Sequence, residues 1–198
     1  MSYVERRRFL WVLFLAGIAL AAVVANSTTL ARMSFDELAQ KSSAVARLRC
    51  QSSETHWDGG ELWTETRFTV VESNKGLLGG SITVRMLGGR ADGVTSRVDG
   101  VPVFRAGEEV YLFLWGKPGE AYRVLGWSQG TFRIRRDPRT GEEKITQESS
   151  GANFDQRKQQ FHADVRGDVQ RDGIRGIALA AFQEKLRQAL GRGVAAEH

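Results

Sequence analysis

Residues Glu109–Trp115 read EVYLFLW, and all but the first are apolar. A strand with one face in solvent alternates polar and apolar residues, whereas a strand buried on both faces is a continuous apolar run. The segment is therefore expected to be the central strand of a sheet that is covered on both sides. Lys117-Pro-Gly-Glu120 follows it and predicts a turn.

On both sides of this segment, the sequence has short stretches in which polar and apolar residues alternate, and turn residues separate these stretches. Asp58-Gly59 predicts a hairpin between the first two of them. Such spacing favours a mainly β fold, either a small antiparallel barrel of the OB or netrin-like kind or, alternatively, a sandwich. The expected strands cover residues 43–53, 61–72, 81–87, 109–115, 121–127, 131–136 and 142–147, with a long loop at 88–100 that holds a short strand at 94–98.

Two helices are expected to flank the strands. Ser34 and Glu37 have the spacing of a capping box, which predicts a short helix over 35–41. An amphipathic stripe predicts a C-terminal helix over 174–190, ended by Gly191. The resulting organisation is an export segment at 1–25, a β domain at 34–147, a flexible connector at 148–172 and a C-terminal helix at 173–191.

The N-terminus has the order of a secretion signal. Three arginines precede the apolar run Phe9–Ala25, and small residues stand before a cleavage point between Ala25 and Asn26. Cleavage is favoured over an uncleaved membrane anchor, because 17 residues is the lower limit for a spanning helix. Either way the domain is expected outside the cytoplasm, periplasmic or secreted, or held at the inner membrane.

Net charge and cysteine count limit the classes of partner and the disulfides that can be expected. The net charge of +5 is small for 198 residues, so nucleic acid is not expected as a partner. Contact with a membrane is expected only through residues 1–25, and only if they are not cleaved. Cys50 is the single cysteine and cannot form a disulfide within the chain. It continues the alternation of Ala44, Ala46 and Leu48, which predicts a buried thiol; an intermolecular disulfide is the alternative.

No residue set with a recognisable chemistry stands out. His56, His162 and His198 lack the spacing of metal ligands, and no nucleophile elbow occurs. No catalytic residue, cofactor or metal site is therefore assigned. The enzyme alternative is a hydrolase of envelope polymers whose site is assembled from scattered acids such as Glu61, Glu65 and Asp92.

Exposed aromatic residues are the candidates for binding. Trp57 falls in a predicted turn, and Trp63 lies on the outward face of its strand together with Arg67. Such a surface can stack a sugar, a base or a partner's proline. The alternative is that Trp63 is covered by a helix.

Several stretches together resemble a group of exported bacterial proteins of unknown function with a small OB or netrin-like domain. These stretches are Met33-Ser-Phe-Asp-Glu-Leu38, Thr66–Val70 with Lys75-Gly76, Gly107–Leu114, Tyr122–Gly126 and Gln129–Phe132. The resemblance implies export and a β fold and supplies no catalytic residues.

The leading hypothesis is a non-enzymatic binding or accessory module of the cell envelope, whose partner is another exported protein. If the domain is netrin-like, fold analogy suggests a protease as that partner. The hydrolase above is one alternative, and a structural protein anchored by residues 9–25 is another.

Overall fold

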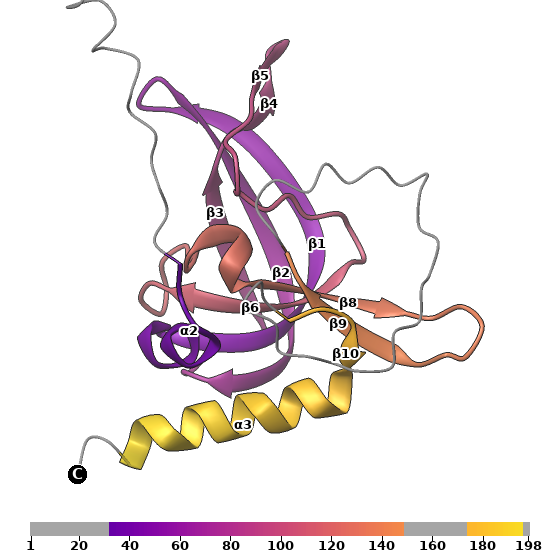
Figure 1. Ribbon diagram of the computed structural model, residues 1–198. Coiled ribbons are helices and arrows are strands. Elements are labelled where there is room, and N and C mark those ends of the chain that lie inside the picture. The colour runs from indigo at the N-terminus through magenta and orange to yellow at the C-terminus, as the bar shows by residue number, and fades with distance from the viewer. Residues whose placement is uncertain (1–31, 149–173, 196–198) are drawn as a thin grey trace, which may run out of the picture. The chain divides into compact units, whose positions relative to one another are not determined.

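The computed structural model describes residues 32–148 and 174–195. Antiparallel strands dominate this part of the chain, with a short helix before them and a longer helix after them (Figure 1). The predicted mainly β class with two flanking helices is thereby confirmed. In chain order the elements are α2 (Phe35–Lys41), β1 (Ala44–Asp58), β2 (Glu61–Lys75), β3 (Ser81–Leu87), β4 (Gly89–Ala91), β5 (Val94–Ser96), β6 (Glu109–Trp115), β7 (Arg123–Val124), the 3-10 helix η2 (Trp127–Gly130), β8 (Thr131–Arg136), β9 (Glu143–Gln147), β10 (Ile177–Ala178) and α3 (Leu179–Ala195).

Strand β6 occupies the middle of the main sheet, as its sequence predicts. The strand order is β10-β9-β8-β6-β1-β2-β3, and β7 also pairs with β6. Every side chain from Val110 to Leu114 is fully buried. Val110, Leu112 and Leu114 point into one core, whereas Tyr111 and Phe113 point into another.

The two cores lie on opposite faces of β6. The first joins β1, β2, β3 and β7, and it includes Cys50, Phe68 and Val84. The second lies between the sheet and the two helices. Phe35 of α2 makes edge-on contacts there with Phe113, Phe132 and Phe182, at centroid distances of 5.5 to 5.8 Å.

The β1–β2 hairpin is longer than its sequence predicts. Both strands have 15 residues, and they pair from Val45–Lys75 to Asp58–Glu61. The predicted end at residue 53 is wrong because residues 51–54 are exposed and polar, so backbone pairing with β2 extends the strand where side-chain alternation does not. Gly59 and Gly60 have φ of 60° and 82°, the left-handed pair that a two-residue hairpin turn needs.

Both helices pack on the second core and contact each other. The capping box of α2 is confirmed: Ser34 Oγ accepts from the Glu37 N–H, and Glu37 Oε2 accepts from the Ser34 N–H. The predicted bounds of α3 are wrong at both ends. Residues 177–178 form β10, and the helix continues through Gly191 to Ala195 because it packs along α2, where Arg192 pairs with Asp36 at 2.8 Å.

Two connections also differ from prediction. Within the loop at 88–100 the short strand expected at 94–98 is present as β5, but it forms a hairpin with β4, which was not predicted; the strand expected at 121–127 is only Arg123–Val124. Gly126 has φ of 63° and turns the chain into η2, which ends the strand. Before β7, Tyr122 forms one isolated parallel bridge with Val84 of β3. No ladder among the described residues closes the sheet into a barrel, so barrel and sandwich both stay predictions.

Several predictions fall outside the described residues. They are the export segment at 1–25 with its cleavage point at Ala25–Asn26, and the connector apart from residue 148. None of the described helices is long and apolar enough to span a membrane.

Candidate functional site

Two indoles and two guanidinium groups gather on the outer side of β2, β3 and β7. The Arg85 Cζ lies 4.5 Å from the Trp63 ring centroid. The Arg123 Cζ lies 5.3 Å from Trp63 and 5.5 Å from Trp115. These distances are those of cation–π contacts. We call Trp63, Arg85, Trp115 and Arg123 the indole–guanidinium cluster.

Strand pairing brings the cluster together from four elements. Trp115 and Arg123 are partners across the β6–β7 pair. The Arg85 N–H donates to the Tyr122 carbonyl at 2.8 Å, which sets Arg123 beside β3. Trp63 lies diagonally across from Arg85, whose direct partner on β2 is Glu65. The cluster thus depends on the bridge between β3 and the residue before β7.

The cluster carries more cationic than anionic charge. Arg85 forms an ion pair with Asp58, and the hydrogen bond and charge of Arg85 hold the pKa of Asp58 below its usual value. Arg85 Nε is buried and has no hydrogen-bond partner in the described part of the chain. Arg123 is exposed and pairs with no carboxylate among the described residues. One guanidinium of the cluster is therefore available to an external anion.

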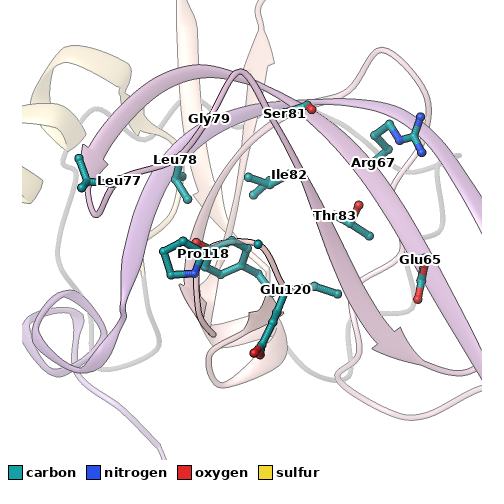
Figure 2. A pocket seen from close by; sticks show the side chains of 13 residues that line it. Glu65, Arg67, Leu77, Leu78, Gly79, Ser81, Ile82, Thr83, Pro118 and Glu120 are labelled. Carbon is teal, nitrogen blue, oxygen red and sulfur yellow. The ribbon is translucent and has the colours of Figure 1, made fainter.

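A cavity of about 390 Å³ opens beside the cluster. Its walls come from β2, β3, the segment between them and the β6–β7 turn (Figure 2). Glu65 and Arg67 line it from β2, while Pro118 and Glu120 stand on the turn. It adjoins the cluster because Glu65 is the partner of Arg85 and Tyr122 precedes Arg123.

The cavity lining is mixed in character. Arg67 is exposed and makes no ion pair with the rest of the described chain. Glu65 Oε1 lies 3.9 Å from His56 Nε2, and the Thr83 hydroxyl lies on the facing strand. One cation, two carboxylates and hydroxyl groups are thus all present, and such a set donates and accepts hydrogen bonds within one site.

The structure separates the binding candidates that the sequence suggests. Trp63 and Arg67 share the outer face of β2, and Trp63 is covered by arginines rather than by a helix. Trp57 pairs with the buried Leu62 and therefore lies on the opposite face of the hairpin. Its indole donates to Asp92 Oδ2 at 3.1 Å.

Arg85, Trp115 and Arg123 are the cluster residues that sequence reasoning missed. Trp115 ends an apolar run and so resembles a core residue, yet it is 47% exposed. Arginine at an outward strand position is common and carries no signal of its own. The alternation of residues 81–87 could have indicated that Arg85 points outward, because Ile82, Val84 and Met86 point inward.

The scattered acids do not form one site. Glu65 lines the cavity, but Glu61 and Asp92 are absent from its lining. Glu61 begins β2, and Asp92 lies in the β4–β5 turn against Trp57. Among the described residues, no group of three or more His, Cys, Asp or Glu side chains has the arrangement of a metal site.

Cys50 is buried at 3% exposure in the first core, which confirms its predicted inward position. Burial raises the pKa of its thiol, so the nucleophilic thiolate is disfavoured.

Comparison with known proteins found no protein-family model, no curated protein and no solved structure that matches this chain.

Proposed function

We propose that this chain is an exported, non-enzymatic binding module of the cell envelope. It holds its ligand on the outer side of β2 and β3, beside the β6–β7 turn. The observation that carries the proposal is the indole–guanidinium cluster, in which Trp63 orients two arginines and one of them lacks a carboxylate partner in the described chain.

The energetics of the cluster support binding rather than stability. Exposed cation–π contacts contribute only about 0.5–1 kcal/mol each. Two guanidinium groups beside one indole repel each other, and a single carboxylate, that of Asp58, offsets that repulsion within the described residues. An arrangement of charged and aromatic groups that contributes little to the stability of the free protein is typical of a site that a ligand completes.

Export rests on the N-terminal sequence. An intact mass of the chain isolated from the producing cell's envelope tests it, with a start at Asn26 as the expected result. A mass that includes residues 1–25 in an envelope fraction would favour the anchored alternative.

Binding is tested with the full chain in mild detergent. The probes are isolated cell-wall polymer and detergent-extracted envelope protein, compared in a sedimentation assay. We expect one of the two fractions to bind the wild type. The double variant R123Q/W63F, which we call the cluster variant, should bind that fraction roughly tenfold more weakly. The control R97Q removes the same charge from an exposed residue outside the cluster and the cavity, and it should bind as the wild type does.

Two results would overturn the proposal. One is equal binding by the cluster variant and by R97Q. The other is release of soluble fragments from the cell-wall polymer by the wild type, which would identify the hydrolase alternative. In that case E65Q should abolish release, since Glu65 is the predicted acid that lines the cavity.

A further inference from the structure

The charges around the cavity have a pattern that restricts the ligand. Arg67 and Arg123 are exposed cations without a carboxylate partner in the described chain. Glu65 and Glu120 line the same cavity, and neither forms an ion pair with Arg67 or Arg123. One cation, Arg67, therefore lines the cavity with two carboxylates, and a second cation, Arg123, lies beside it; no ion pair within the described chain neutralises either arginine.

An anionic polymer with few hydroxyl groups fits this pattern poorly, because Glu65 and Glu120 need hydrogen-bond donors. A nucleic acid has a phosphate at every nucleotide, and an acidic peptide has few hydroxyl groups. Either one would place negative charge against Glu65 and Glu120 while satisfying Arg67 and Arg123. Carboxylates in a binding site are acceptors, and they need a ligand that donates hydrogen bonds.

A sugar polymer with carboxylate substituents fits both sets of groups. Sugar hydroxyls can donate to Glu65 and Glu120, and a sugar carboxylate can accept two parallel hydrogen bonds from the Arg123 guanidinium. The half-exposed indole of Trp115, next to Arg123, offers an apolar face to the C–H surface of a sugar ring. Thr83 adds a hydroxyl at the cavity wall.

We propose that the ligand of this face is an acidic polysaccharide. Its carboxylate binds Arg123 beside Trp115, and its hydroxyl groups bind Glu65 and Glu120 in the adjoining cavity. This inference rests on the proposed function, because it names the ligand class of the same binding face.

The test uses the full chain in mild detergent with three defined probes. They are polygalacturonate, the same polymer with its carboxyl groups reduced to alcohols, and poly-L-glutamate. Dissociation constants are measured by isothermal titration calorimetry at low salt, since screening weakens exposed charge pairs. We expect polygalacturonate to bind at least roughly tenfold more tightly than either of the other two probes.

Variants separate the two halves of the site. R123Q should weaken binding of polygalacturonate roughly tenfold and leave the reduced polymer unaffected. E120A should weaken binding of polygalacturonate, because an acceptor is lost, and should strengthen any binding of poly-L-glutamate, because a repulsion is lost. Both residues are exposed, so both variants should unfold at the wild-type urea concentration; R97Q is again the matched control.

The outcomes distinguish the ligand class from the binding function. Tighter binding of poly-L-glutamate than of polygalacturonate would overturn the polysaccharide assignment. A second result would also overturn it: no binding to polygalacturonate, while the envelope fraction still binds the wild type and not the cluster variant. That result would leave the proposed binding function intact. Loss of both would overturn both proposals.

Discussion

The Tyr111 hydroxyl on β6 donates a hydrogen bond of 3.1 Å to Glu72 Oε2 on β2, across the intervening strand β1. Gln183 of α3 donates to both groups, at 3.1 Å to the hydroxyl and 3.3 Å to the carboxylate. Burial, together with the Glu72 charge, raises the pKa of Tyr111 to about 12. The hydroxyl therefore stays protonated and can keep donating. This polar network joins the C-terminal helix to the sheet.

Y111F should lower the free energy of unfolding by about 1–2 kcal/mol, because the substitution leaves Glu72 and Gln183 each without one partner. The measurement is urea unfolding followed by tryptophan fluorescence. The matched control is Y122F: Tyr122 is also buried, but its hydroxyl has no hydrogen bond to the described residues. Equal losses for the two variants would mean that the network contributes nothing beyond ring packing.

Local pattern was sufficient for the elements that bury a regular set of side chains. EVYLFLW placed β6 at the centre of the sheet, and the alternation of Ile82, Val84 and Met86 placed β3 to the residue. The indole–guanidinium cluster could not be predicted from local sequence pattern. Trp63 and Arg67 could be assigned to one outer face, but which strands adjoin that face depends on contacts such as the bridge between Val84 and Tyr122. No spacing along the chain encodes that contact.

The end of α3 shows how packing can override a local signal. Glycine commonly ends a helix in a left-handed conformation, so Gly191 predicted a stop. In the structure Gly191 has ordinary helical geometry, while Leu186 and Ala189 are buried in the second core and Arg192 reaches Asp36 of α2. These contacts outweigh a helix-propensity cost of about 1 kcal/mol.

G191A should therefore raise the stability of the chain by about 0.5–1 kcal/mol, since an alanine at this position meets no atom within 4 Å and favours the helix. The comparison variant is G141A. Gly141 also has open space around it, but its φ is +74°, so an alanine there should destabilise by about 1 kcal/mol. Thermal unfolding of both variants measures the difference. A loss of stability in G191A like that in G141A would restore Gly191 as the helix end.

Glu109 should make the stability of the chain sensitive to acid. Burial raises the pKa of its carboxyl, but hydrogen bonds from Arg49 at 2.9 Å and Arg47 at 2.8 Å, with their charges, outweigh burial and lower it. Because the pKa is lower in the folded state, the ionised Glu109 carboxylate stabilises the fold at pH values above the unfolded pKa, near 4.3. This contribution to the free energy of unfolding is lost as the pH falls through the lower pKa of the folded state.

E109Q should consequently be less stable than the wild type at pH 7, and its stability should fall less between pH 5 and pH 3. The two curves of unfolding free energy against pH should converge at the acid end. E61Q is the control, because Glu61 is the exposed first residue of β2 and forms no ion pair with the described chain. Parallel curves for E109Q and the wild type would show that the arginines leave this carboxyl unaffected.

Cys50 should be protected from thiol reagents for as long as the chain is folded. Its side chain is 3% exposed, and its raised pKa keeps the fraction of reactive thiolate low at neutral pH. We expect reaction with Ellman's reagent to be slow in buffer and rapid in urea, and the urea dependence of its rate should follow the unfolding transition measured by fluorescence. Non-reducing electrophoresis of the untreated chain should show a monomer. Rapid labelling in buffer, or a dimer that reductant dissolves, would support the alternative of a disulfide between two chains and would place the thiol at a surface that the folded chain opens.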